Sequence, residues 1–339
     1  MAVWERVTID VDGVACEAQA PVIISASRAT DIPAFYTEWL LHRIGQGFVK
    51  WVNPFSSRPV HVSFEKARLF VFWTKNPRPL LAHLAFFDRR RLNYYFQFTL
   101  NDYEAEGLEP GVPPLAERIA TFIELSERIG QEKVIWRCDP LLLTDRITVD
   151  TLLARIGKIG DRLQGHTSRL VFSFADIKGY DKVRRNLQQS GVHAREFGEA
   201  DMRTLAAGLA ELNKKWGFAL GTCAERVDLA GCGIEHNRCV DDRLIARVFS
   251  HDRELMAFVR PGPVQGELFG DSGDPYSRLK DKGQRPACGC ILSKDIGEYN
   301  TCPHLCAYCY ANANKASALS NFERHRTAPF GATIRGEQA

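Results

Sequence analysis

The chain has 339 residues, of which 45% are hydrophobic and 25% are charged, and its formal net charge is +3 at pH 7. This length suits one large α/β domain or two smaller ones, and the charge is too mild to indicate a nucleic-acid partner by itself. No apolar run reaches the roughly 20 residues of a membrane span, and the first residues lack the apolar core of a signal peptide. We therefore expect a cytoplasmic protein whose ten cysteines are reduced and serve as metal ligands, reactive thiols or small buried residues.

Short apolar segments alternate with longer amphipathic ones over the first 225 residues. Runs rich in Val, Ile, Phe, Tyr and Trp predict strands, which fall at 21–25, 48–52, 68–73, 92–100, 133–137, 169–174 and 217–222. Apolar residues at helical spacing predict helices, which fall at 33–45, 114–130, 149–163 and 201–217. The first two helices begin at a proline and end at a glycine, which are typical helix boundaries.

Strands that alternate with helices predict parallel βαβ units. Seven strands favour a TIM-type (β/α) barrel, complete or partly open. An open doubly wound sheet is the main alternative, because the pattern alone cannot show closure. We assign residues 1–225 to the barrel body, 226–287 to a partly helical, otherwise irregular arm, and 288–339 to a cysteine-rich segment that completes the barrel.

Polar residues follow each predicted strand, at the edge where barrel enzymes place their sites. These residues also have an explanation without a functional role, because loops begin with polar residues in any protein. Asn76 and Asp139 each precede a proline, as in ordinary turns. The candidates for a ring around one mouth are Ser27, Arg28, Asp31, Asn53, Thr74, Lys75, Asn76, Thr99, Asn101, Arg137, Asp139, Ser173, Asp176, Thr222 and Glu225.

The densest group of cysteines lies close to the end of the sequence. Cys302, Cys306 and Cys309 have the spacing Cys-x3-Cys-x2-Cys, and Tyr308 precedes the last of them. Three thiolates at this spacing can bind three irons of a 4Fe-4S cluster and leave the fourth iron open to another molecule.

This motif resembles the cluster motif of the radical S-adenosylmethionine enzymes (radical SAM enzymes). The segment CAYCYAN at 306–312 is especially similar to the branch that contains spore photoproduct lyase, and TKNP at 74–77 and RCDP at 137–140 resemble that branch more loosely. A wider resemblance, through essentially the whole chain, is to the uncharacterised DUF1848 family. Its landmarks here are ISASRATDIPAFY, FWTKNP, CAE, QRPACGC and SKDIGEYNTCPHLCAYCYAN.

The resemblance to the radical enzymes implies a chemistry. Cys302, Cys306 and Cys309 would hold a 4Fe-4S cluster. S-adenosylmethionine on the open iron would yield a 5′-deoxyadenosyl radical, which abstracts a hydrogen atom from substrate. An electron donor such as flavodoxin or ferredoxin is implied, and no membrane partner. The side chains expected at the barrel mouth are Arg28, Asn101 and Tyr308 for the cofactor and Lys75, Arg137 and Asp139 for catalysis.

The resemblance leaves the substrate open, because a lyase-like motif allows a nucleic acid, whereas the modest charge slightly favours a small molecule or a peptide.

The position of the motif departs from the radical-enzyme pattern, which places it after the first barrel strand. A circular permutation reconciles the two, because the first and last strands of a barrel are neighbours. We therefore predict a strand at 289–293, a helix at about 312–324, and thiols that converge at the barrel mouth. The sequence offers no clear glycine-rich segment for the methionine end of the cofactor.

Four other cysteines form a second candidate ligand set. They are Cys223, Cys239, Cys288 and Cys290, with Cys232 as an alternative member. Four thiols can hold either a second 4Fe-4S cluster or a structural Zn²⁺ that fastens the irregular arm to the barrel. His304 lies within the triplet and is either a ligand or a residue that supports the loop, whereas Asp295, Tyr299 and Asn300 are expected to brace it.

The alternative to an enzyme is a metal-stabilised binding module, in which zinc or an iron–sulfur cluster serves stability alone. Zinc sites commonly use paired Cys-x2-Cys segments, whereas this chain has a single one, extended by Cys302 into a triplet. We therefore expect radical chemistry ahead of a purely structural metal.

Overall fold

The computed structural model describes residues 4–54, 56–260 and 279–337. Residues 261–278, which the sequence analysis placed in the irregular arm, lie outside the described residues. None of the helices in the described ranges combines the length and the apolar character that crossing a bilayer requires.

The largest sheet of the described residues contains eight strands in the order β13-β12-β10-β8-β7-β6-β3-β14, and each neighbouring pair runs parallel. The strands are β3 (Ile23–Ala26), β6 (Leu69–Thr74), β7 (Asn93–Thr99), β8 (Val134–Leu141), β10 (Arg169–Phe174), β12 (Ala219–Thr222), β13 (Ile234–His236) and β14 (Lys294–Asp295). The predicted parallel α/β architecture is thereby confirmed, with β13 and β14 as the end strands of this order.

The two faces of this sheet carry different cores, because successive side chains of a strand point to opposite faces. In β6, Phe70 and Phe72 join the large cluster that includes the helices of the first 216 residues. Leu69 and Val71 join a second cluster with helices near residue 250. Burial on both faces explains why these strands read as continuous apolar runs rather than alternating ones.

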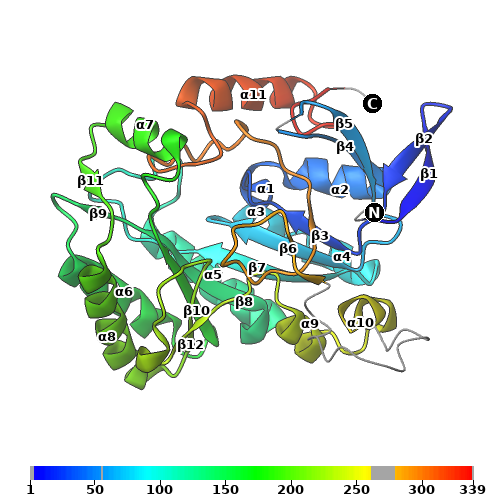
Figure 1. Cartoon of the computed structure of the whole chain (residues 1–339). Coiled ribbons are helices and arrows are strands. Elements are labelled where there is room, and N and C mark those ends of the chain that lie inside the picture. Colours follow the sequence, from blue (N-terminus) through cyan, green and yellow to red (C-terminus); the bar gives the residue numbers. More distant parts are fainter. Residues whose placement is uncertain (1–3, 55, 261–278, 338–339) are drawn as a thin grey trace.

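The first cluster is built from the helices that connect the strands. These are α1 (Ile32–Phe35), α2 (Thr37–Gln46), α3 (Arg78–Leu81), α4 (Leu84–Arg89), α5 (Leu115–Ile129), α6 (Val149–Leu163), α7 (Asp181–Gln189) and α8 (Glu199–Trp216). The predicted helices at 114–130, 149–163 and 201–217 are confirmed, and the one at 33–45 is divided in two at Tyr36. Helices α9 (Asp242–Val248) and α10 (Arg253–Val259) pack on the other face, below the sheet in Figure 1.

One predicted barrel strand belongs to a different sheet. The strand at 48–52 forms as β4 (Phe48–Val52), but it pairs antiparallel with β5 (Pro59–Ser63). Together with β1 (Arg6–Val11) and β2 (Val14–Gln19) they make a separate four-stranded sheet. Asn53 therefore lies in the β4–β5 hairpin, where its backbone N–H donates to Arg58 O at 3.0 Å, and not at the edge of the parallel sheet.

The last part of the chain returns to the first strand of the parallel sheet, as predicted. Strand β14 pairs with β3 through Lys294 and Ile24. The predicted strand at 289–293 is wrong, because Ile291 N donates to Val240 O and Leu292 N donates to Leu279 O. Those residues thus bind the arm, and strand pairing begins only at Lys294.

One more α-helix and two short strands belong to the fold. Helix α11 (Lys315–Thr327) begins later than predicted because Asn314 caps it, accepting from Ser317 N at 2.8 Å. Strands β9 (Leu143–Thr144) and β11 (Ala194–Arg195) form a small antiparallel pair.

Candidate functional site

A buried charged network lies at the carboxyl end of β6. Lys75 Nζ donates to Glu109 Oε1 at 2.7 Å and to Tyr308 Oη at 3.1 Å. The Tyr308 hydroxyl also donates to Glu109, and Asn101 Nδ2 donates to the same carboxylate at 3.2 Å. The structure thus brings together three of the predicted site residues, Lys75, Asn101 and Tyr308, around a carboxylate that the sequence analysis did not select.

The opposite charges of this network keep each other ionised. Burial alone favours neutral forms, but the opposite charges outweigh it, so that the pKa of Lys75 is raised and the pKa of Glu109 is lowered. Arg118 Nη1 lies 3.7 Å from Glu109 Oε2 and adds to this effect. Only 4% of the Glu109 side chain and 15% of the Lys75 side chain are exposed, so both remain charged in a largely dry setting.

The loop of residues 302–309 packs against the loop that carries Glu109. Gly111 N donates to His304 O at 3.0 Å, and Ala307 N donates to Leu108 O at 2.8 Å. A Cβ atom on Gly111 would lie 2.4 Å from Pro303 O, so only glycine permits this approach.

His304 is fixed by both of its ring nitrogens. Nδ1 lies 2.9 Å from Gly111 O, and Nε2 lies 2.7 Å from Asp31 Oδ2. Asp31 also accepts from Lys75 N at 2.7 Å, which ties the ends of β3 and β6 to the cysteine loop. Because both nitrogens have partners, His304 supports the loop and has no free nitrogen with which to bind a metal.

A second charged pair lies on β8. The Arg137 guanidinium donates to the Asp139 carboxylate, which also accepts from the Ser173 hydroxyl on β10. Asp139 N donates to Asn101 Oδ1 at 3.0 Å, so this pair is joined to the Lys75 network through one side chain. Burial disfavours the carboxylate, yet the adjacent Arg137 lowers the pKa of Asp139.

Arg28 and Arg137 both contact Trp73. The Arg28 and Arg137 guanidinium carbons lie 5.0 Å and 5.1 Å from the centre of the Trp73 rings, a distance typical of cation–π contacts. Asp295, which was predicted to brace the cysteine loop, holds the turn after β3 by accepting from Arg28 N at 2.8 Å and from Ser27 Oγ at 2.7 Å.

Cys302, Cys306 and Cys309, here called the C-terminal triplet, lie beside the Lys75 network. Burial raises the pKa of the Cys306 thiol, Lys75 opposes this, and the charges of Glu109, Cys309 and Cys302 add to it. Asn312 N donates to Cys309 Sγ at 3.3 Å, a contact of the kind that stabilises a ligating sulfur.

Cys223, Cys239, Cys288 and Cys290, here called the four-thiol group, come together from distant parts of the chain. Cys223 Sγ lies 3.4 Å from Cys239 Sγ, Cys239 contacts Cys290, and Cys290 contacts Cys288.

Nitrogen donors surround this group. Arg137 Nη1 donates to Cys239 Sγ at 2.9 Å, and Val240 N donates to Cys290 Sγ at 3.3 Å. The alternative member, Cys232, packs against the other cluster, on the opposite face of the sheet.

Neither group of thiols forms disulfides, and all ten cysteines are free. Within the described ranges, no three His, Cys, Asp or Glu side chains are gathered closely enough to form a metal site as they stand. The convergence predicted for the triplet at a barrel mouth therefore stays a prediction.

Sequence reasoning missed Glu109 and Arg118 because neither follows a strand directly. Glu109 lies in a loop within GLEPG, and Arg118 is on α5. The one available signal was the glycine-rich and proline-rich character of 107–114, which marks an irregular loop after a strand end but does not indicate which side chain enters the site.

Comparison with known proteins gives one match. A family model described as "Domain of unknown function (DUF1848)" matches residues 23–311, which include the parallel sheet and every cysteine of the triplet and the four-thiol group. No curated protein and no solved structure matches the chain.

Proposed function

The chain belongs to the DUF1848 family, whose function is unknown, and we propose that it is a radical S-adenosylmethionine enzyme. The observation that carries the proposal is the position of the C-terminal triplet beside the Lys75–Glu109–Tyr308 network. In this proposal the parallel sheet is a partly open barrel. The triplet lies at its mouth, because β14 places the end of the chain next to β3.

The residues present fit a cluster of iron and sulfide. Three thiols in a single loop, with an amide N–H donated to Cys309, are soft ligands of the kind that such clusters take. With His304 occupied, Cys302, Cys306 and Cys309 are the residues that would hold the cluster. When bound with S-adenosylmethionine, it would supply hydrogen-atom abstraction from a substrate.

The surrounding residues bind and orient in this proposal. The Lys75 ammonium and the Arg28 guanidinium offer positive charge to the carboxylate of the cofactor, and the Asn101 amide fixes the Tyr308 hydroxyl at 3.1 Å. The Asp139 side chain is 23% exposed, whereas Arg137 is buried. In this proposal the Asp139 carboxylate therefore faces the substrate, and Arg137 orients that carboxylate. The buried aromatic and ionic contacts keep water from the reacting atoms.

The four-thiol group holds a second metal centre in this proposal, either a 4Fe-4S cluster for electron relay or a structural zinc ion. Tetrahedral zinc with Zn–S bonds of about 2.3 Å separates its sulfurs by roughly 3.8 Å, close to the 3.4 Å between Cys223 and Cys239. That spacing is the observation that favours the second candidate function, a zinc-stabilised binding module without radical chemistry.

Anaerobic purification tests the proposal. We expect a brown protein with the visible absorption of a 4Fe-4S cluster, bleached by dithionite, that releases 5′-deoxyadenosine from S-adenosylmethionine. Cys306→Ala should abolish this release while the protein stays folded, and Cys232→Ala, a half-buried thiol outside both groups, should not. A colourless protein with stoichiometric zinc would contradict the radical proposal and favour the zinc-stabilised module.

A further inference from the structure

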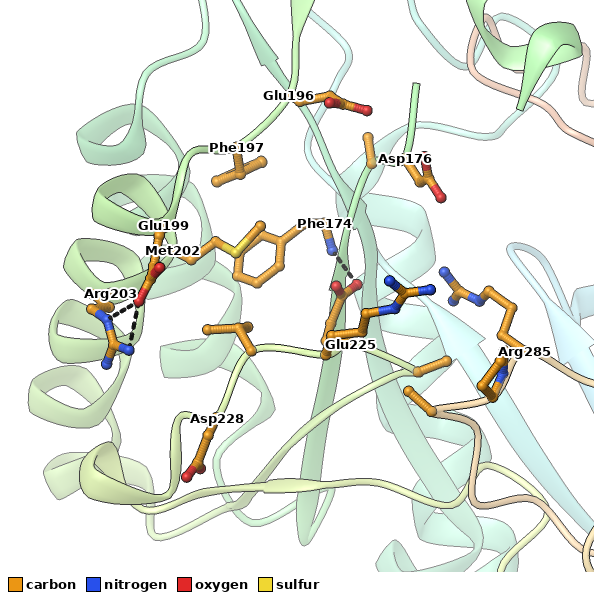
Figure 2. A pocket seen from close by; sticks show the side chains of 16 residues that line it. Phe174, Asp176, Glu196, Phe197, Glu199, Met202, Arg203, Glu225, Asp228 and Arg285 are labelled. Atoms are coloured by element: carbon orange, nitrogen blue, oxygen red, sulfur yellow. Dashed lines mark hydrogen bonds and ion pairs between the residues drawn. The ribbon is translucent and has the colours of Figure 1, made fainter. Parts of the chain in front are cut away.

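A cavity of about 710 Å³ opens beyond the carboxyl ends of β10 and β12. Its walls come from the residues after these strands, from the start of α8, and from residues 285–287 of the arm (Figure 2). This volume falls within the range of pockets that hold small organic molecules, about 300–1,000 Å³. Open parallel sheets and barrels alike bind their ligands beyond the carboxyl ends of the strands, so the position of the cavity also favours a ligand site.

The lining of the cavity has an excess of negative charge. Five of its side chains are carboxylates, and three are arginines. The carboxylates are Asp176, Glu196, Glu199, Glu225 and Asp228, and the arginines are Arg203, Arg226 and Arg285. Lys178 Nζ lies 3.4 Å from Glu196 Oε2, but 87% of the lysine side chain is exposed, so water screens this pair.

The arginines do not cancel this excess. Glu199 pairs with Arg203 at 2.7 Å, and Figure 2 shows this pair apart from Glu225, on the other side of the Phe174 ring. These two residues therefore neutralise each other at the rim of the cavity and leave the charges beside Glu225 unchanged.

Arg285 faces more than one negative partner. Its guanidinium interacts electrostatically with both Glu225 and Asp139, and one of its nitrogens donates to Cys223 O at 3.2 Å. Of the arginines in the described lining, this leaves Arg226, which is exposed. It stands against three further carboxylates, those of Asp176, Glu196 and Asp228.

Carboxylates from three neighbouring strands converge on one side of the cavity. Asp139 lies on β8, Asp176 follows β10 and Glu225 follows β12, and these strands are adjacent in the sheet. The charges of Asp139 and Asp176 both act on Glu225. Like charges that are brought together in this way repel each other, and a cation between them relieves the repulsion.

An apolar wall, formed by Phe174, Phe197 and Met202, lies beside these carboxylates. The two aromatic rings have their centres 4.6 Å apart, and Met202 lies next to them in Figure 2. In the same view the Glu225 carboxylate lies between the Phe174 ring and Arg285. Aromatic faces attract cations, and a thioether adapts to an apolar body of irregular shape. Carboxylates next to aromatic rings therefore favour an organic cation.

We propose that this cavity binds an organic cation, an ammonium or guanidinium compound with an apolar body. The cationic group pairs with Glu225 and Asp176, and the body packs on the apolar wall. The cavity begins one residue beyond Ser173, whose hydroxyl binds Asp139, so a bound molecule lies next to the Asp139 carboxylate. That this cation is the substrate rests on the proposed function, whereas its binding does not.

Calorimetric titration of the anaerobically purified full-length protein at neutral pH tests the charge of the ligand. The probes are 2-phenylethylamine, 2-phenylethylguanidine, the neutral 2-phenylethanol and the anionic 3-phenylpropanoate, which share one apolar body. We expect a cation to bind at a single site and the alcohol to bind at least about tenfold more weakly, because a charged hydrogen bond is worth that much. The anion should not bind. The tighter of the two cations identifies the cationic group.

Asp176→Asn and Glu225→Gln should each weaken binding of the cation by about tenfold. Each change keeps the oxygen that accepts from a backbone N–H, that of Gly179 or Phe174, and removes only the charge. Glu127→Gln, an exposed glutamate of α5 outside the cavity, should leave binding unchanged. Asp176 is exposed, so its variant reports on the site even where Glu225→Gln fails to fold.

Four outcomes overturn the proposal: no binding of either cation, equal binding of the alcohol and the cations, tighter binding of the anion, or unchanged binding in both cavity variants. Cation binding by a protein without iron would leave the cavity site standing and contradict the radical function. Release of 5′-deoxyadenosine by a protein that binds neither cation would do the reverse.

Discussion

The C-terminal triplet and the four-thiol group use the same ligand in different surroundings. The triplet belongs to one loop, and the charges of Lys75 and Glu109 both act on Cys306. The four-thiol group draws on three separate segments, its thiols contact each other, and donors from Arg137, Asn237 and Val240 point at its sulfurs.

The difference separates two tasks that a cysteine can have. The four-thiol group ties the arm to the end of β12, and Cys239, Cys288 and Cys290 are part of the core around α9 and α10. The triplet instead lies beside the Lys75–Glu109 ion pair, which Tyr308 of the same loop contacts through its hydroxyl. We therefore expect changes near the triplet to act through buried charge, and changes in the four-thiol group to act through the folding of the arm.

The largest effect on stability is expected from Glu109→Gln, in the charged network beside the triplet. The change keeps the shape of the side chain but leaves the buried Lys75 ammonium without its counter-ion. Removing one partner of a buried ion pair costs about 3–5 kcal/mol. Denaturant unfolding of the two proteins measures the loss.

Glu124→Gln provides the matched control, because Glu124 pairs with Arg78 at 2.6 Å while about half of each side chain is exposed. That change should cost no more than about 1 kcal/mol. Equal costs for the two glutamates would show that the Lys75 network is as well solvated as the surface.

The sequence predicts a group of cysteines more readily when its members lie close together along the chain. The triplet is a local pattern, and its spacing identifies it. The members of the four-thiol group were selected by elimination, and they meet only because β12, β13 and the arm converge at one end of the sheet. Glu109 was missed for a related reason, since a long loop carries it to Lys75.

The fold shows the same limit. Apolar periodicity predicted α5, α6 and α8 nearly to the residue because their caps are local. It could not assign β4 to a sheet, because a strand after a helix reads the same whether it pairs with β3 or turns back as a hairpin. Strand β14 is two residues long, too short for any periodic signal.

Cys239→Ala tests the four-thiol group. The change removes a fully buried thiol that contacts Cys223 and accepts from Arg137. An unsatisfied buried donor and a small cavity together cost about 2–3 kcal/mol. If the two groups bind separate metals, as proposed, metal analysis of this variant should show loss from the four-thiol group and unchanged iron in the triplet. Cys16→Ala, on a strand of the other sheet, should change stability by less than about 0.5 kcal/mol. Loss of all iron in Cys239→Ala would mean that the two groups share one centre.

The smallest effect is expected at Asp252, which fastens α10 beneath the face that holds the four-thiol group. Its carboxylate caps α10 through Leu255 N and binds Arg68 at 2.9 Å and Asn93 at 2.6 Å. Burial would raise the pKa of Asp252, but the Leu255 amide and Arg68 outweigh it and lower the pKa below its ordinary 3.8. Asp252→Asn keeps a good capping residue and loses only the charge, at a cost of about 1 kcal/mol.

The pH dependence of that cost identifies its origin. A carboxylate with a lowered folded-state pKa stabilises the protein above its ordinary pKa, and the contribution is lost as the pH falls through the folded value. The stability gap between the unchanged protein and the Asp252→Asn variant should therefore be full at neutral pH and narrow below about pH 4. Thr148→Ala removes an uncharged cap from α6, so its gap should stay constant with pH. A gap for Asp252→Asn that also stays constant would show that shape and not charge holds α10, and the face with the four-thiol group would then depend on packing alone.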